Sequence, residues 1–317
     1  MYDFNDMHID LGIFYFNLLT MALIVVLGIF LGKKKWIDER VNRFLTTLVL
    51  SVTWPCALFN AFPDKFHSEQ LSVILWAAGG GLIIFAITIL LANLVFRSRK
   101  KPTEATNFRF AYIFADTSFL GFPLVTAAFG TQGLAPYAGF IFVFCVLLFS
   151  YGVMMMQKHG RFNWQILAKA ALNPNIIAVI LGAIFFTFSW KLPTPIGNSV
   201  NYVGAMTTPL ALICIGYMLS RVHVLAVLKK VNVVLVSLLS LVVRPAIALV
   251  ICKLFNMPPI VTAVLVLMFA LPAATSLALF ARRYDGNTES ASELVVVGTV
   301  LSAATVPLVM WLASLWQ

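Results

Sequence analysis

Long apolar stretches recur along the chain, and short polar connections separate them. A helix needs about 20 predominantly apolar residues to cross a bilayer, and stretches of that length and composition occur ten times. They predict transmembrane helices near residues 11–31, 42–62, 70–96, 108–129, 134–156, 164–188, 197–219, 231–252, 259–281 and 291–314. Because no connection is long enough for a soluble domain, we expect residues 1–317 to form a single all-α membrane unit.

The basic residues divide unequally between alternate connections. The odd-numbered connections and their flanks hold eighteen of the 22 lysines and arginines, whereas the even-numbered ones hold Lys65, Lys191 and Lys253. Short loops rich in Lys and Arg stay in the cytoplasm, so this division predicts that both termini lie outside the cytoplasm. The remaining basic residue, Arg244, lies inside a predicted helix.

Composition supports a membrane protein and excludes one class of partner. Apolar residues make up 61% of the chain and charged residues 11%, with a mean hydropathy of +0.94, whereas a soluble domain carries about 25% charged residues. We therefore expect lipid to cover most of the surface. The net charge of +10 arises from the loop residues that orient the chain, so it does not indicate a nucleic-acid partner.

Sequence motifs for other kinds of chemistry are absent from the chain. The four cysteines stand singly in apolar runs, so neither a disulfide framework nor a zinc site is indicated. No Walker phosphate-binding loop and no HExxH zinc-protease motif occurs. We expect no cofactor, no metal site and no enzymatic activity.

The two halves of the chain repeat each other. Two segments recur at the same offset of 154 residues: 25–28 (VVLG) as 179–182 (VILG), and 53–58 (TWPCAL) as 207–212 (TTPLAL). Pro123 and Pro272 take corresponding places in the fourth and ninth helices if one loop differs in length. Because each half has an odd number of helices, the second half enters the membrane from the opposite side. Such inverted repeats are typical of secondary transporters, which bind substrate at discontinuous helices.

Motifs in four of the predicted helices resemble those of one transporter family. They are Asp116-Thr117-Ser118-Phe119-Leu120-Gly121-Phe122-Pro123 in the fourth helix, Asn173-Pro174 at the start of the sixth, Thr208-Pro209-Leu210-Ala211-Leu212 with Gly216 in the seventh, and Leu271-Pro272-Ala273-Ala274-Thr275-Ser276 in the ninth. With these motifs the whole chain resembles the auxin efflux carrier family, which includes plant auxin exporters and bacterial malonate and malate permeases. The most specific part lies around Gly121 and Pro123.

The resemblance implies a fold of ten helices in two inverted five-helix repeats, like that of the bile-acid carriers, with the fourth and ninth helices crossing at broken centres. Residues of about 11–62 and 164–219 would form a scaffold, often dimeric, and residues of about 70–156 and 231–314 a transport domain. Organic anions would bind near the crossover, and an elevator-like shift would give alternating access. One residue departs from the family: Asp116 stands where Asn is usual. Asn can donate a hydrogen bond to a carboxylate, whereas an ionised Asp repels one.

We expect the substrate site where the fourth and ninth helices break, around Pro123 and Pro272. Unpaired backbone N–H groups at the start of each second half-helix favour anions. Gly121 and Ala270, each two residues before its proline, would let the two helices approach closely. Ser and Thr are common packing residues in membrane helices, but here they would also supply hydroxyl contacts from Thr117, Ser118, Thr275 and Ser276.

Two ionisable side chains, Asp116 and Arg244, lie deep in the predicted helices. A charge at the centre of a membrane helix costs about 2.5–3.5 kcal/mol on insertion scales, so a functional role is the first hypothesis. Asp116 would couple transport to protons, because removal from water disfavours the charged form of a carboxyl group. The alternatives are an ion pair with Arg244 or a cap on a half-helix. Arg244 would neutralise Asp116 or contact the substrate anion.

These observations predict a secondary active transporter of small organic anions, either mono- or dicarboxylates, driven by a proton or sodium gradient or by the substrate's own gradient. The long central loop common in plant members is missing, which favours a bacterial protein of the inner membrane. The expected partners are the anion, the coupling ion, lipid and a second copy bound through the scaffold helices. Two alternatives stay open: a sodium-coupled symporter of the bile-acid-carrier type, and a sensor that binds a ligand without moving it.

Overall fold

The computed structural model describes residues 11–62, 68–97, 102–157, 172–222 and 224–314. These residues form helices joined by short connections, and their only extended pairing is one isolated antiparallel bridge. Among the described residues, five helical stretches are long and apolar enough to cross a membrane: Glu69–Val95, Thr117–Met156, Thr194–Arg221, Val231–Leu254 and Thr288–Ala313. Three further apolar helices, at Leu19–Lys33, Pro174–Thr187 and Pro259–Ala270, are shorter. Helices occupy most of the described part of every predicted apolar run, and residues 164–171 of the sixth run lie outside the described part.

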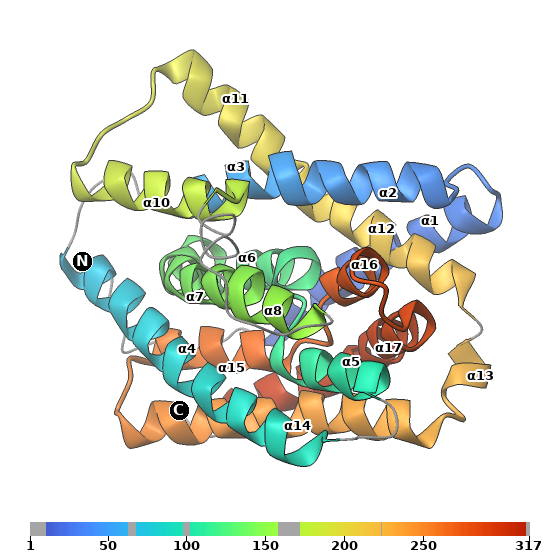
Figure 1. Ribbon diagram of the computed structural model, residues 1–317. Coiled ribbons are helices and arrows are strands. Elements are labelled where there is room, and N and C mark those ends of the chain that lie inside the picture. Colours follow the sequence, from blue (N-terminus) through green and yellow to red (C-terminus); the bar gives the residue numbers. More distant parts are fainter. Residues whose placement is uncertain (1–10, 63–67, 98–101, 158–171, 223, 315–317) are drawn as a thin grey trace.

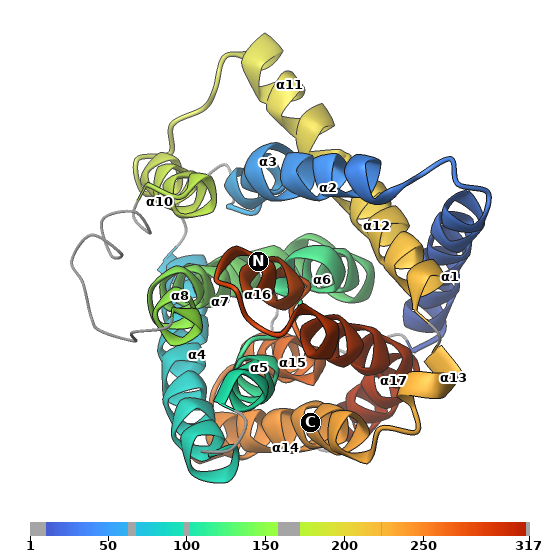
Figure 2. The same cartoon turned by 45° about the vertical axis from the view of Figure 1, so that its right-hand side comes forward.

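One group of helices, here called the first set, lies along one side of the molecule (Figures 1 and 2). It consists of α1 (Leu11–Lys33), α2 (Glu39–Leu48), the π-helical turn η1 (Val49–Thr53), α3 (Trp54–Phe59), α10 (Pro174–Thr187), α11 (Thr194–Ala205) and α12 (Thr207–Arg221). α1 packs along α12, and α3 packs against α10 and α11. A Cβ on Gly216 would lie 2.7 Å from the Cα of Gly28, so α1 and α12 touch through their backbones.

Most of the remaining helices and helical turns form the second set. It consists of α4 (Ser68–Val95), α5 (Pro102–Ile113), the π-helical turn η2 (Thr117–Gly121), α6 (Phe122–Phe129), the 3-10 turn η3 (Gly130–Gly133), α7 (Leu134–Leu147), the π-helical turn η4 (Leu148–Gly152), α8 (Val153–Met156), α14 (Val231–Leu254), α15 (Pro259–Ala270), α16 (Ser276–Arg283) and α17 (Thr288–Ser314). α4 packs on α7, and α14 packs on α15 and α17. The short helix α13 (Val224–Val227) leads from α12 towards α14. The two sets meet where α1 contacts α6, α12 contacts η2 and α10 contacts α7.

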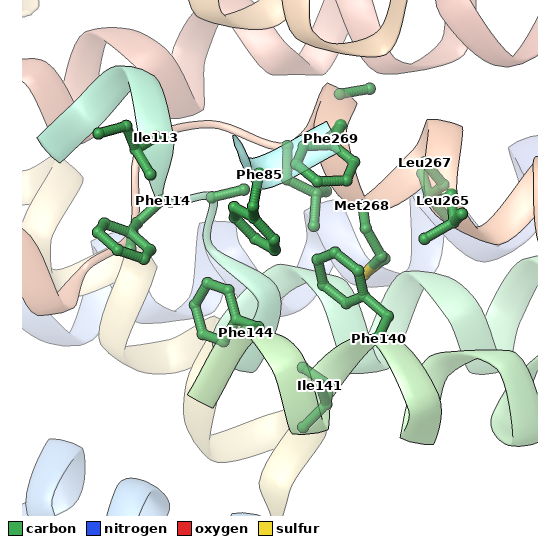
Figure 3. Close-up of a cluster of buried hydrophobic side chains, with 14 of the residues drawn as sticks. Phe85, Ile113, Phe114, Phe140, Ile141, Phe144, Leu265, Leu267, Met268 and Phe269 are labelled. Atoms are coloured by element: carbon green, nitrogen blue, oxygen red, sulfur yellow. The ribbon is translucent and has the colours of Figure 1, made fainter. Parts of the chain in front are cut away.

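An aromatic cluster packs between α4, α7 and α15 in the second set (Figure 3). The ring centroid of Phe85 lies 4.9 Å from that of Phe269 and 5.7 Å from that of Phe140. Phe114, 6.3 Å from Phe85, is the first residue after α5, and Phe269 lies in the last turn of α15. Such ring pairs contribute about 0.5–1.5 kcal/mol beyond burial, so the cluster fixes two helices at the points where they end.

Candidate functional site

The fourth and ninth apolar runs are each interrupted, and the interruptions lie against each other. Residues 114–116 separate α5 from η2, and residues 271–275 separate α15 from α16. The N–H of Asp116 donates to the carbonyl of Pro272 (2.8 Å), and the N–H of Ala274 donates to the carbonyl of Phe114 (3.0 Å). These bonds form the isolated bridge between Ala115 and Ala273. Non-helical backbone is tolerated at membrane depth where protein partners satisfy its polar groups, and the two breaks do this for each other.

The first break lies earlier in the chain than Pro123, where we expected it. Pro123 is the second residue of α6, and the π-helical turn η2 precedes it. Proline lacks an N–H and interrupts the α-helical hydrogen bonds, and the wider turn carries the chain past that gap. The second break includes Pro272, as predicted, and the ring of this proline packs against Gly298 of α17.

Asp116 is the last residue of the first break, faces the second break and is 1% exposed. Its Oδ1 accepts a hydrogen bond from the backbone N–H of Phe119 (3.2 Å), so the side chain caps η2 and the half-helix that continues as α6. The Ser118 side chain lies beside the carboxylate, as do the backbone N–H and the hydroxyl of Thr275, where α16 begins. Oδ2 nevertheless has no hydrogen bond of good geometry to any described residue. One buried carboxylate therefore faces the start of two half-helices.

The predicted hydroxyl residues lie at the ends of the two breaks, and Ser118 and Thr275 lie beside this carboxylate. Thr117, Ser118 and Thr275 are buried, and Ser276 is half-buried. Within the described part of the chain, the hydroxyl oxygens of Thr117 and Ser276 are buried without a hydrogen-bond partner. A buried polar group left unpaired costs about 1–3 kcal/mol, so these atoms are suited to meet a ligand. Gly121 permits the close approach that we expected, because a Cβ there would lie 3.1 Å from a methyl group of Leu271.

Arg244 of α14 lies against the second break and does not form an ion pair with Asp116. Its Nε donates to the carbonyl of Ser240 (2.7 Å), and its Nη2 donates to the carbonyl of Leu271. Leu271 is the C-terminal cap of α15, and a cation interacts favourably with the carbonyl groups at a helix end. The side chain is fully buried, and its Nη1 has no partner among the described residues. Arg244 therefore supports the ninth run at its break and keeps one donor free.

A cavity of about 350 Å³ borders the crossover between the two sets of helices. Val25 of α1 and Leu212 of α12 line one side, and Leu120 of η2, Leu271 and several residues of α17 line the other. Thr299 and Ser302, its two hydroxyl residues, already donate to backbone carbonyls of α17. The cavity is therefore apolar where it meets the polar crossover.

Two residues at the crossover were not predicted from the sequence. The Tyr137 hydroxyl of α7 donates to the carbonyl of Thr117 (2.9 Å) and accepts a hydrogen bond from Nε1 of Trp54 in α3 (3.3 Å). Both side chains are at most 1% exposed. Aromatic residues in apolar runs ordinarily pack through their rings. Trp54 and Tyr137 are distinguished by their hydrogen-bond partners, which only the fold reveals.

Comparisons with known proteins identify the family of the chain. The sequence matches the membrane transport protein family over residues 13–310. An uncharacterized transporter of Methanocaldococcus jannaschii is 24% identical over 93% of this chain and 97% of its own length. A protein of Rhizobium meliloti named "Putative malonate transporter" is 25% identical over 95% of this chain and 92% of its own. Auxin efflux carrier component 8 of Arabidopsis thaliana is 26% identical over 43% of this chain and 38% of its own. The chain is a multi-pass membrane transporter that belongs to the membrane transport protein family, the family of the auxin efflux carriers.

Proposed function

We propose that the protein is a secondary active transporter of small organic anions that works by an elevator-type shift. In this proposal ten transmembrane helices form two inverted five-helix repeats. The first set of helices is the scaffold, over residues of about 11–62 and 164–219, and the second set is the transport domain, over about 70–156 and 231–314. Membership of a transporter family supports this assignment, as does the crossing of two interrupted helices in the second set.

The observation that carries the proposal is the pair of breaks joined at Ala115 and Ala273. The start of each second half-helix presents backbone N–H groups, which carry about +0.5 of partial charge and favour an anion. We place the substrate carboxylate there, in contact with the free hydroxyls of Thr117 and Ser276. Arg244 donates to Leu271 at the second break, and its Nη1 has no partner among the described residues. We propose that this Nη1 also donates a hydrogen bond to the substrate anion.

We further propose that Asp116 carries a proton when the anion binds. An ionised Asp116 already faces the starts of both half-helices and would repel a second carboxylate at short range. A protonated carboxyl group can instead donate a hydrogen bond to the anion. Proton and anion would then cross together. Sodium coupling is the alternative, and exchange that depends on sodium but not on pH would favour it.

Two observations bear on the identity of the substrate. The name of the Rhizobium meliloti relative points to malonate, whereas the apolar cavity beside the crossover suits an anion with a larger apolar body. We therefore propose a mono- or dicarboxylate and expect the size of the apolar part to decide affinity.

We place the protein in a bacterial inner membrane, with both termini outside the cytoplasm and a homodimer formed through the first set. Figure 2 shows α11 projecting from the body, and Tyr202 on this helix is 76% exposed. A large exposed aromatic side chain on a projecting helix is consistent with contact to lipid or to a second copy.

Counterflow in proteoliposomes tests the proposal. Vesicles loaded with unlabelled malonate, or with an unlabelled aromatic monocarboxylate, should accumulate the labelled form of the same anion transiently. A carrier exchanges the two pools, whereas a sensor that only binds does not. Binding of the anion without exchange would contradict a transport function and favour the sensor.

A further inference from the structure

Three polar contacts made by side chains of the described residues join the first set of helices to the second. Nδ2 of Asn17 in α1 donates to the carbonyl of Ala127 in α6 (2.9 Å). Glu39 of α2 accepts from Arg282 of α16 (2.5 Å). The third contact joins Trp54 to Tyr137, and among these three it alone continues to a residue that adjoins a helix break, Thr117.

The bond from Trp54 to Tyr137 and the bond from Tyr137 to Thr117 are here together called the Trp54–Tyr137–Thr117 relay. Trp54 follows the π-helical turn η1 in the first set, and Tyr137 and Thr117 both belong to the second set. The carbonyl that receives the second bond belongs to the residue directly after Asp116. The relay therefore connects the first set of helices to the backbone beside the carboxylate.

We propose that Trp54 and Tyr137 are positioning residues that stabilise this conformation and hold the start of η2, directly after Asp116, in place. The inference rests on the proposed function, because it assumes that the second set moves relative to the first. The bond from Tyr137 to Thr117 lies within the second set and stays intact during such a movement. The bond from Trp54 to Tyr137 crosses between the sets and has to break.

The two bonds have separable consequences. Trp54→Phe removes the bond between the sets, together with part of the buried ring, and leaves the bond from Tyr137 to Thr117 in place. It should therefore change the balance of conformations and leave substrate affinity within each conformation unchanged. Tyr137→Phe removes both bonds, so it should change that balance and also weaken substrate binding. Since both substitutions delete the same inter-set bond, the double variant should change the balance no more than Tyr137→Phe alone.

Tyr151→Phe is the matched control. The Tyr151 hydroxyl accepts a hydrogen bond from Nδ2 of Asn93 (2.9 Å), and both residues belong to the second set. The substitution removes a phenol hydroxyl from the same apolar run as Tyr137 without touching an inter-set bond. All three substitutions keep an aromatic ring, and thermal melting of the purified variants shows whether each is folded.

Distance measurements between spin labels test the relay. One label is placed at Trp36, in the connection between α1 and α2 of the first set, and the other at Val231, the first residue of α14 in the second set. These side chains are 72% and 74% exposed. A net hydrogen bond of ordinary strength corresponds to about a fivefold change in an equilibrium ratio. Two positions of the second set relative to the first would give two populations of distance between the labels. We expect the ratio of these populations to change about fivefold in Trp54→Phe and Tyr137→Phe, and to stay unchanged in Tyr151→Phe.

An unchanged ratio in Trp54→Phe and Tyr137→Phe would overturn the proposal, as would an equal change in Tyr151→Phe. The outcome is independent of the counterflow assay. If the wild-type protein exchanges no anion but the ratio changes as expected, the transport proposal fails and the relay stands. If exchange occurs and the ratio stays constant, the relay fails and the transport proposal stands.

Discussion

Asp116 has a structural role and a proposed coupling role in the same side chain. Its Oδ1 caps a half-helix, and its Oδ2 is buried without a partner among the described residues. Capping was one of the alternatives open from the sequence, and the structure shows that it applies. The ion pair with Arg244, the other alternative, is not formed. Arg244 donates instead to the carbonyl at the end of α15.

Substitution of Asp116 by Asn separates the two roles. Asn caps helices about as well as Asp, so the Asp116→Asn protein should fold normally. The Asn side chain cannot take up a proton near neutral pH. We therefore expect uptake of the anion to lose its pH dependence while exchange of the anion continues. Uptake measured on both sides of neutral pH checks this. Retention of the wild-type pH profile would exclude Asp116 as the coupling group.

Asp116→Ala is the control for the cap. Alanine removes the acceptor for the Phe119 N–H, and losing an N-cap costs about 0.5–2 kcal/mol. We therefore expect this variant to melt at a lower temperature than Asp116→Asn.

Arg244→Met tests the support at the end of α15. The substitution leaves the carbonyl of Leu271 buried without this donor, which costs about 1–3 kcal/mol. We expect a lower melting temperature than in the wild type, and a smaller loss in Arg244→Lys, which keeps a donor and the charge. Equal melting temperatures for Arg244→Met and the wild type would show that the carbonyl finds another partner.

At the scale of helices, close backbone contacts decide which pairs pack. Gly28 and Gly32 form a small-residue motif that lets α1 approach α12, where Gly216 lies opposite. A Cβ on Gly79 of α4, by contrast, would meet no atom of the neighbouring described elements within 4 Å. In the sequence, Gly216 and Gly79 are both glycines in apolar runs, and nothing there distinguishes the glycine at a close contact from the one without a neighbour.

Gly216→Ala should therefore destabilise the protein and Gly79→Ala should not. A Cβ on Gly216 would lie 2.2 Å from the carbonyl oxygen of Val25, so α1 and α12 would have to separate. Overpacking of this kind costs about 1–3 kcal/mol. At Gly79, alanine is favoured over glycine in a helix by about 1 kcal/mol. Melting temperatures of both variants measure the difference, and equal values would contradict the contact.

A second contact between elements depends on pH. Hydrogen bonds from Arg282 and Arg43 lower the pKa of Glu39 below its usual value of 4.5. A carboxyl group with a lowered pKa contributes stability above its unfolded pKa, and the contribution is lost as the pH falls through the lowered value. Because the pair is exposed, we expect only a small effect. Melting curves should show that Arg282→Gln costs less in acid than at neutral pH.

At the scale of the whole molecule, the orientation in the membrane follows from loop charge. We predict that the connection between α1 and α2 lies in the cytoplasm and that the connection between α10 and α11 lies outside. In a background without the four native cysteines, Lys191→Cys should react with a membrane-impermeant thiol reagent in intact cells. Lys34→Cys should react only after the cells are made permeable. The reverse pattern would invert the predicted topology.

The sequence alone determined the class of protein, the positions of the apolar helices and the two segments, around Asp116 and Pro272, that meet at the crossover. These follow from local properties: the length of each apolar run, the charge of each loop, and a motif whose residues are neighbours in the chain. The sequence could not locate the limits of the two breaks, residues 114–116 and 271–275. A helix ends where its backbone finds partners elsewhere, and those partners are far away in the chain. Only the tertiary structure brought Asp116 to Pro272, Arg244 to Leu271 and Trp54 to Tyr137. These contacts join residues far apart in the chain, and packing between helices decides them.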